Sequence, residues 1–192
     1  MTASACADCG TVTGIQAPRV LGGDELRVGK RGAAIFSRDG SRRRWLYRSL
    51  SGEMKRVGFV MLNPSSAGAD DNDRTITRCE GFAHREGAGS MEVANLSDWI
   101  ETDSANLGIP AARGLMTDSS SRHYLKHVMG CDLVIAAWGA HPWARGKLAL
   151  WWLQENGGEL PRGFVSCLGR TKTGAPNHPL YLPANKPLEL WP

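Results

Sequence analysis

The sequence predicts an α/β fold in three layers, α/β/α, with a central sheet of four mainly parallel strands and a β-hairpin near the N-terminus. Apolar runs of strand length alternate with segments of helical spacing along the chain. This alternation favours parallel strands joined by crossover helices. A polar loop follows each apolar run, as in open α/β sheets, where ligands bind at the carboxyl ends of the strands.

Composition places the chain among ordinary globular proteins. Its 192 residues are 42% hydrophobic and 22% charged, which is typical of one soluble domain with a sizeable core. No apolar run approaches the length of a membrane span, and no basic-then-apolar leader indicates export. The cysteine count of 5 is odd, and the spacing does not suggest a disulfide scaffold. We therefore expect a cytoplasmic monomer without membrane contact.

The N-terminal segment differs from the rest of the chain. It is rich in Thr, Ala and Gly without a sustained period, so we expect a flexible leader over residues 1–22 and a single domain over residues 23–192. Cys6 and Cys9 form a Cys-x-x-Cys pair in this leader. A structural zinc site usually needs a second pair or nearby histidines, and the next cysteine is Cys79. The sequence therefore predicts an incidental pair and no metal.

A basic hairpin comes next. Residues 33–37 and 43–48 have the pattern of two short strands around an Asp-Gly turn, which predicts a hairpin beside the main sheet. Across residues 27–56 many arginines and lysines are opposed only by Asp39 and Glu53. Such a block can bind a polyanion such as nucleic acid, or it can be a solvated edge kept soluble by arginine. The charge run alone favours the solvated edge.

The strand and loop that follow organise the predicted site. Residues 57–62 form an apolar run typical of a buried central strand, and the run ends at Asn63 and Pro64. Pro64 cannot donate to a sheet ladder, and it disfavours helix at Asn63. A polar loop then leads to a helical pattern, and its side chains are candidates for chemistry unless it is an ordinary capped βα loop. The candidates are Asn63, Ser65, Ser66, Asp70, Asp71 and Asp73.

Periodicity defines the remaining elements. Helices are predicted over residues 75–85, 119–129 and 145–155, and strands within residues 90–96, 131–139 and 164–169. In the first helix, one face carries Ile76, Cys79, Phe82 and Ala83. His123 and His127 are spaced i and i+4, but no carboxylate completes the His-Glu-x-x-His motif. This favours ordinary surface or core roles for both histidines.

The loops after parallel strands meet at one edge of a sheet. The predicted loops at this edge are residues 63–73, 95–102, 138–145 and 170–181. No Gly-x-Gly-x-x-Gly motif or phosphate loop follows a strand, so we expect no nucleotide cofactor. A site at this edge would therefore act through the protein's own side chains.

Two resemblances to known families follow from these motifs. Residues 61–67, 71–78, 169–172 and 178–182 resemble the signature of a bacterial and phage domain family of unknown function, which begins Leu-Asn-Pro-Ser-Ser-Ala here. This resemblance runs from about Trp45 to the C-terminus and implies no assigned reaction.

The second resemblance is to the uracil-DNA glycosylase superfamily. Residues 62–65 are similar to the Gly-Ile-Asn-Pro-Gly motif of its mismatch-specific branch, and residues 93–96 to the strand whose Asn reads the flipped base. Residues 134–139 are similar to the third strand, Leu-Leu-Trp-Gly, and His178-Pro179 falls where the His-Pro-Ser-Pro motif should lie. The chain departs from the family in two ways: Asn63 replaces the catalytic aspartate, and Leu180-Tyr181 replaces Ser-Pro.

The glycosylase resemblance implies a function and a site. It implies hydrolysis of the N-glycosidic bond of a damaged or modified base in DNA, modified phage bases included, after the base is flipped out. The resemblance implies that Asn63 holds water and that His178 donates to the leaving base. The missing charge could come from Asp70, Asp71 or Asp73, of which we take Asp71 as the catalytic residue. The implied substrate-binding residues are Pro64, Ser65, Ser66, Asn95, Trp138 and Tyr181. The implied DNA-binding residues are Arg42, Arg43, Arg44, Arg145, Lys147, Arg170 and Lys172.

Two alternatives stay open at this point. The same edge of the sheet could form a non-catalytic module that binds a nucleotide or modified base. It could also carry a hydrolase or transferase that acts on free nucleosides. Each alternative uses the same loops, so the sequence does not separate them from a glycosylase.

Overall fold

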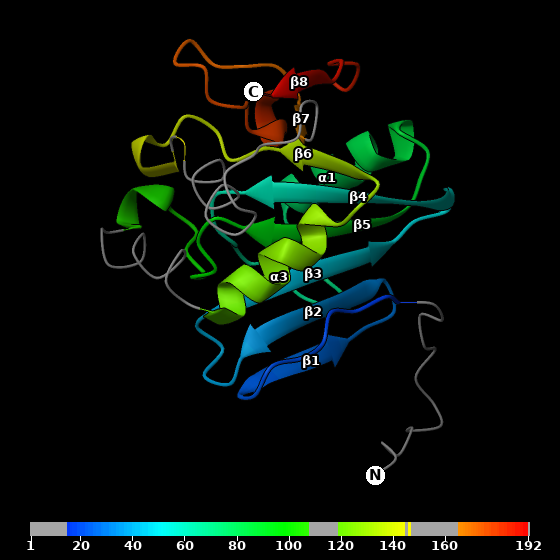
Figure 1. Cartoon of the computed structure of the whole chain (residues 1–192), viewed down its shortest axis with the longest axis vertical. Helices are drawn as coiled ribbons and strands as arrows, with labels where there is room; N and C mark the ends of the chain where they lie inside the picture. Colours follow the sequence, from blue (N-terminus) through cyan, green and yellow to red (C-terminus); the bar gives the residue numbers. More distant parts are fainter. Residues whose placement is uncertain (1–14, 108–118, 145, 147–164, 192) are drawn as a thin grey trace, which may run out of the picture.

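The protein folds around one mixed sheet of eight strands, in the order β1-β2-β3-β5-β4-β6-β7-β8 (Figure 1). The computed structural model describes residues 15–107, 119–144, 146 and 165–191. The strands are β1 Asp24–Val28, β2 Gly32–Ser37, β3 Arg43–Ser49, β4 Glu53–Met61, β5 Ala88–Asn95, β6 Leu133–Ala136, β7 Val165–Cys167 and β8 Glu189–Trp191. The prediction of an α/β protein is confirmed, and the sheet has eight strands where the sequence predicts four and a hairpin.

The sheet is parallel in the middle and antiparallel at both sides. β4 pairs in parallel with β5 and with β6, and β6 pairs in parallel with β7. β1, β2 and β3 extend the sheet as antiparallel strands beside β5, and β8 adds antiparallel to β7. The strands β4, β5, β6 and β7 therefore end at the same edge.

The sheet is larger than predicted in part because the predicted hairpin pairs with it. β2 and β3 pair antiparallel as expected, but β3 also pairs with β5, with Leu46 opposite Val93. β2 and most of β3 are buried, so the hairpin lies inside the sheet rather than as a solvated edge. The outer strands β1 and β8 are mostly exposed and lack the apolar pattern from which the sequence predicts strands.

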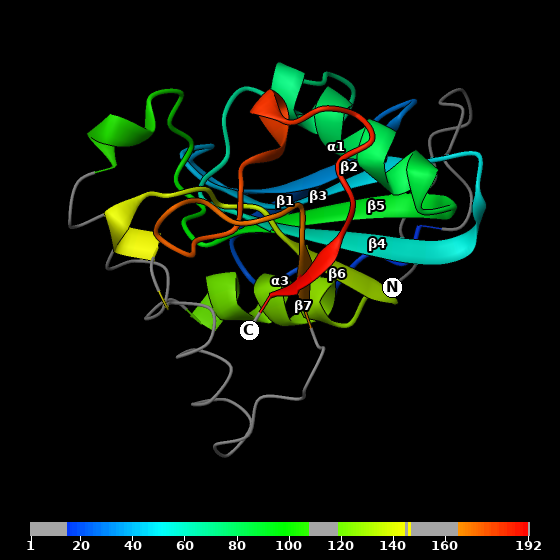
Figure 2. The ribbon, with the colours of Figure 1, turned by 90° about the horizontal axis from the view of Figure 1, so that it is seen from above.

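Two α-helices in the described residues cover opposite faces of the sheet (Figure 2). These are α1 Arg74–Arg85 and α3 Ser119–Met129, as the periodicity predicts to within one residue. The predicted apolar face of α1 is buried, and its N-cap is Asp73, whose carboxylate accepts from the Ile76 amide at 2.7 Å. Short 3₁₀ helices are η1 Ser104–Asn106, η2 Pro142–Ala144 and η3 Pro179–Tyr181.

Close packing of α3 depends on a glycine in the central strand. A Cβ at Gly58 would lie 2.7 Å from the carbonyl oxygen of Val128, so only glycine lets the end of α3 approach β4. The α3 side of the sheet buries Trp45, Tyr124 and Leu125, and the α1 side buries Phe59 and Phe82. These two cores fix β4 and its carboxyl end between the helices.

Several sequence predictions fall on residues that the structure does not describe. The predicted helix over residues 145–155 and most of the predicted leader, with Cys6 and Cys9, lie outside the described residues. Ile15, Ala17 and Leu21 pack against the core on the α3 side. None of the described helices is long and apolar enough to cross a membrane.

Candidate functional site

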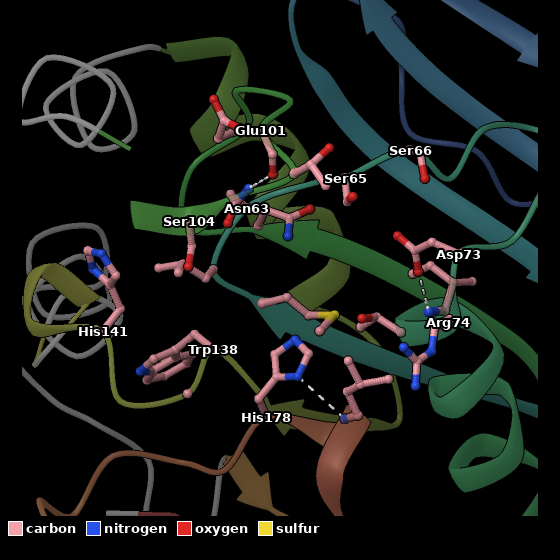
Figure 3. Close-up of a pocket in the computed structure, with 18 of the residues that line it drawn as sticks. Asn63, Ser65, Ser66, Asp73, Arg74, Glu101, Ser104, Trp138, His141 and His178 are labelled. Atoms are coloured by element: carbon pink, nitrogen blue, oxygen red, sulfur yellow. Dashed lines mark hydrogen bonds between the residues drawn. The ribbon is translucent and has the colours of Figure 1, made fainter. Parts of the chain in front are cut away.

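A pocket of about 760 Å³ lies at the carboxyl ends of the parallel strands (Figure 3). All four predicted loops contribute to its lining, although they are far apart in sequence. Asn63 and Glu101 lie on one side, and His178 and Trp138 lie on the opposite side. The predicted site residues that the structure brings together are Arg43, Asn63, Ser65, Ser66, Asn95, Trp138, His178 and Tyr181.

Asn63 is held by its own amide nitrogen. Its Nδ2 donates to the carbonyl oxygens of Pro64 at 3.0 Å and Glu101 at 2.6 Å. The Glu101 amide in turn donates to the Pro64 carbonyl at 3.0 Å, so the two loops are tied together. The described residues donate no hydrogen bond to Oδ1 of Asn63. This oxygen can therefore accept a hydrogen bond from a water or a ligand in the pocket.

His178 presents one nitrogen to the pocket. It caps η3, and its Nδ1 accepts from the Leu180 amide at 3.4 Å. Burial lowers the pKa of His178, against the opposing influence of Asp73. A neutral imidazole whose Nδ1 accepts carries its proton on Nε2, so His178 can donate from Nε2.

The segment that carries His178 is clamped to α1. Arg78 donates to the carbonyl oxygen of Leu182, and Arg85 donates to the carbonyl oxygens of Ala184 at 3.0 Å and Lys186 at 2.6 Å. These bonds position η3 at the pocket although it is distant from α1 in sequence.

Asn95 and Arg43 form the floor of the pocket. Both are buried, at 6% and 2% exposure, and both line the cavity. Nη2 of Arg43 donates to Oδ1 of Asn95 at 3.3 Å, and Nη1 donates to the carbonyl of Ala67 at 3.0 Å. Among the described residues, neither Nδ2 of Asn95 nor Nε of Arg43 has a hydrogen-bond partner. Burial lowers the pKa of Arg43 to about 10, although Asp73 opposes this shift.

Two aromatic side chains border the pocket in different ways. Trp138 is buried and packs edge-on against Trp191, with ring centroids 4.8 Å apart. Tyr181 is 84% exposed at the pocket mouth, with its ring 6.3 Å from that of His178. Trp138 can therefore form an apolar wall, whereas Tyr181 offers a free aromatic face.

Two carboxylates of the described residues line the cavity, and one of them, Asp73, is among the three predicted alternatives. Asp71, the one taken as catalytic, is exposed and does not line the cavity, and neither does Asp70. Glu101 is the second carboxylate of the lining. Each accepts from a backbone amide: Asp73 from Ile76, and Glu101 from Asp103 at 3.0 Å. Pro64 is buried and outside the lining, so it acts through the backbone oxygen that holds Asn63.

Comparison with protein families gives one match. A family described as a protein of unknown function, DUF1643, matches residues 43–180. The chain belongs to the DUF1643 family. The prediction of a family of unknown function is thereby confirmed, and the matched span covers every pocket residue named above except Tyr181. No curated protein and no solved structure matches the chain.

The three predicted DNA-binding arginines at the start of β3 all contact other parts of the protein. Arg43 and Arg44 are buried, so the prediction that they contact DNA phosphates at the surface is wrong. Arg44 forms ion pairs with Asp24, at 3.3 Å, and with Asp98. Arg42 is partly exposed, pairs with Asp98 at 3.0 Å and stacks over Trp99. A charge run therefore did not predict a free basic surface, because acidic partners come from distant segments.

The remaining predicted DNA-binding residues lie near the C-terminal loop or are not described. Arg170 is exposed and pairs with Glu189 at 3.1 Å, while Lys172 is exposed nearby. Arg145 and Lys147 lie outside the described residues. Neither Arg170 nor Lys172 lines the pocket.

Three of the pocket residues that sequence reasoning missed have groups that could contact a ligand or hold the site. Glu101 holds Asn63 through its backbone carbonyl, which no side-chain motif could reveal. Arg74 is exposed at the pocket edge and is the first residue of α1. The sequence signal that could have identified it is its position directly after Asp73, the N-cap of this helix. His141 lines the pocket, and its buried Nδ1 has no partner among the described residues.

The two spaced histidines of α3 serve other contacts. Nε2 of His127 lies 3.0 Å from Glu92, and Nε2 of His123 lies 2.9 Å from the carbonyl oxygen of Arg19. In the described part of the chain, no group of three or more His, Cys, Asp or Glu side chains could hold a metal.

Proposed function

We propose that this protein is a DNA glycosylase that hydrolyses the N-glycosidic bond of a damaged or modified base. One observation supports this proposal above the others: the four segments that resemble the uracil-DNA glycosylase motifs supply Asn63, Asn95, Trp138 and His178 to one pocket. A volume of about 760 Å³ lies within the range of ligand sites and could hold a flipped nucleotide. We also propose that the α/β domain shares the fold of that superfamily.

The proposed reaction needs two groups on opposite sides of the glycosidic bond. The bond between the sugar carbon and the base nitrogen breaks, and its electron pair leaves with the base. A water oxygen bonds to the sugar carbon, and a proton from that water ends on the free base. Asn63 would hold the water through Oδ1, and His178 would donate from Nε2 to the base as negative charge develops. Their positions on opposite sides of the pocket suit these roles.

A second function is supported by the carboxylates. Both carboxylates that line the pocket, on Asp73 and Glu101, already accept backbone hydrogen bonds. An amide such as Asn63 is a poor base, so neither it nor an engaged carboxylate readily removes a proton from water. A module that binds a nucleotide or modified base without cleaving it would have the same pocket.

Incubation with DNA that carries varied modified bases separates these functions. We expect mass spectrometry to detect a free base and an abasic strand in equal amounts. Asn63→Ala and His178→Ala should each slow release about 10²- to 10³-fold, as the loss of one fixed donor or acceptor does elsewhere. The double variant should be less impaired than the product of the single effects, because both residues act on one transition state.

A matched control tests whether the pocket or general damage causes the loss. Asn106→Ala changes an exposed asparagine outside the pocket and should release base at the wild-type rate. Affinity for the modified DNA should persist in the Asn63 and His178 variants, since transition-state contacts need not contribute to ground-state binding. Tight binding without release in the wild-type protein would favour the binding module, and release at full rate in both single variants would refute the assigned residues.

A further inference from the structure

The strand β1 forms an open outer edge of the sheet (Figure 1). It spans five residues, Asp24–Val28, and four of them are exposed. The other outer strand, β8, has only three residues, and the carbonyl oxygen of its Leu190 accepts from Arg170 at 2.8 Å. An open edge can pair with a further strand, and proteins usually block it with Pro, Lys or a bulge. β1 contains none of these features.

The hydrogen bonds to β2 determine which backbone groups of β1 point outward. Just beyond the strand, the Gly29 amide donates to the carbonyl oxygen of Gly32, its opposite residue, at 2.9 Å. Bonded and non-bonded pairs alternate along an antiparallel ladder, so the odd-numbered residues of β1 bond to β2. The N–H and C=O groups of Leu26 and Val28 therefore point away from the sheet, and among the described residues they have no partner.

The side chains of β1 divide between the two faces of the sheet. Glu25 and Arg27 lie on the α1 face, where the Arg27 guanidinium stacks over the ring of Phe36 at 4.5 Å from its centroid. Glu25 and Arg27 also contact each other at 3.7 Å, and both side chains are 52% exposed. Leu26 and Val28 lie on the opposite face and are 41% and 43% exposed. β1 therefore presents two opposite charges on one face and two apolar side chains on the other.

We infer that β1 pairs antiparallel with β1 of a second copy of this chain, with Leu26 on the two-fold axis. In this register Leu26 exchanges both backbone hydrogen bonds with Leu26 of the second copy, and Glu25 lies opposite Arg27 of the other copy twice. Outward groups can bond only to outward groups, so the neighbouring registers are shifted by two residues. One shift places Glu25 opposite Glu25, the other places Arg27 opposite Arg27, and like charges directly opposite are destabilising. Charge therefore favours the first register.

The proposed pairing is closed and leaves the pocket open. It uses the free edge of β1 in both copies, so it gives a dimer with one continuous sheet rather than a filament. Equivalent strands of the two copies run in opposite directions, so their pockets open at opposite edges of that sheet. One short strand pair buries little area, so we expect a reversible dimer with a dissociation constant on the order of 100 μM in place of the predicted monomer. The dimer does not require the proposed glycosylase reaction.

Sedimentation velocity and NMR hydrogen exchange on the full chain test the dimer. Between about 10 μM and about 1 mM, the average mass should rise toward twice that of the monomer. Over the same range the Leu26 and Val28 amides should become protected from exchange, whereas the Glu25 and Arg27 amides, bonded to β2, should be protected throughout. Leu26→Pro removes only an outward N–H and should give a folded monomer. A monomeric mass for the wild-type protein at about 1 mM, or a dimer that persists in Leu26→Pro, would overturn the inference.

Charge reversal tests the register, and it also tests the pairing if Leu26→Pro does not fold. Glu25→Arg and Arg27→Glu each replace both opposite-charge pairs with like-charge pairs, so each should weaken dimerisation about tenfold or more. An equimolar mixture of the two variants restores opposite charges and should form a heterodimer of about wild-type affinity. Glu53→Arg and Lys126→Glu are matched controls at exposed positions outside β1 and should leave dimerisation unchanged. Dimers of wild-type strength in both single variants, or no heterodimer in the mixture, would contradict the inferred register.

Discussion

Two buried polar clusters on the same pair of strands have opposite character. Trp45 of β3 and Glu92 of β5 belong to the first, and Arg43 and Asn95 of those strands belong to the second, at the pocket. Glu92 is 1% exposed and accepts from Trp45 Nε1 at 2.8 Å and from Arg56 Nη2 at 2.7 Å. The pocket cluster, in contrast, keeps two donors unpaired among the described residues.

The difference indicates which cluster serves stability and which serves binding. Burial raises the pKa of Glu92, but the hydrogen bonds from His127, Trp45 and Arg56 outweigh it, and the net shift is downward. A carboxylate that stays ionised in the interior has all the partners it needs. In the Arg43–Asn95 pair, two donors have no acceptor among the described residues, as expected where a ligand supplies the acceptors.

The largest expected effect on stability comes from removing Glu92, the carboxylate at the centre of the first cluster. Glu92→Ala removes the carboxylate and leaves the buried Trp45 N–H and the partly exposed Arg56 without their acceptor. We expect a loss of about 3 kcal/mol in the free energy of unfolding, measured by urea denaturation, because a buried donor left unpaired alone costs about 1–3 kcal/mol and the contacts of Arg56 and His127 are lost as well. Glu25→Ala is the matched control: Glu25 is exposed and 3.7 Å from Arg27, so the loss should stay below about 1 kcal/mol. A loss for Glu92→Ala as small as for Glu25→Ala would remove the contrast between the clusters.

The second effect is smaller and has the opposite sign. Asn95→Asp places a carboxylate beside the unpaired Arg43, so we expect the free energy of unfolding to rise by about 1 kcal/mol. Urea denaturation of the variant and of the wild-type protein measures this change. A destabilised Asn95→Asp variant would mean that Arg43 does not need an anion.

Local sequence patterns predict many of the strands and helices that surround this site. The apolar run of β4, the cap at Asp73 and the buried face of α1 follow from short-range periodicity and capping chemistry, and the structure has them. The common edge of the loops was also predictable, because parallel strands bring their carboxyl ends together. Asn63, Asn95 and His178 were thus expected together before any contact was known.

Long-range partners were not predictable in this way. Arg43 and Arg44 read as surface charges, yet each is buried by segments more than twenty residues away in sequence, such as the Asp98 that pairs with Arg44. Asp71 and Asp73 are equivalent in the sequence, and only the turn into α1 determines which one lines the pocket. The eight-stranded sheet was missed because β1 and β8 are exposed edges whose pairing depends on neighbours rather than on their own pattern.

Acid titration contrasts the pocket, which His178 lines, with the cluster of Glu92. The pKa of folded His178 lies below its ordinary value of 6.5, so the unfolded chain binds its proton first as pH falls. Stability from His178 is therefore present above pH 6.5 and decreases as pH falls from 6.5 toward the folded pKa. Glu92 has a lowered pKa as well, so its contribution is present above its ordinary value of 4.5 and is lost below it.

Unfolding curves at several pH values distinguish the two windows. His178→Asn should flatten the slope of stability against pH just below 6.5 and leave the slope below 4.5 unchanged. Glu92→Gln should do the reverse. An unchanged slope in the upper window for His178→Asn would show that this imidazole is not held neutral by burial. The effect should be smaller than the loss in Glu92→Ala, since His178 is only partly buried.

The smallest effect on stability concerns the exposed cations near the pocket, and it tests whether the ligand is DNA. Arg74 and Lys172 are exposed, Arg74 lines the pocket edge, and neither has an ion-pair partner among the described residues. The Arg74→Ala/Lys172→Ala double variant should change the free energy of unfolding by less than about 0.5 kcal/mol.

The same double variant tests contact with DNA phosphates through the salt dependence of binding. If Arg74 and Lys172 each contact a phosphate, the slope of log affinity against log salt should become shallower by about 2 in all, because each contact releases roughly 0.9 counterion. Lys126→Ala, an exposed cation on α3, should leave the slope unchanged. A slope near zero in the wild-type protein would mean that the pocket binds free bases or nucleosides. The unpaired donors of Arg43 and Asn95 would then face a small ligand rather than a flipped base.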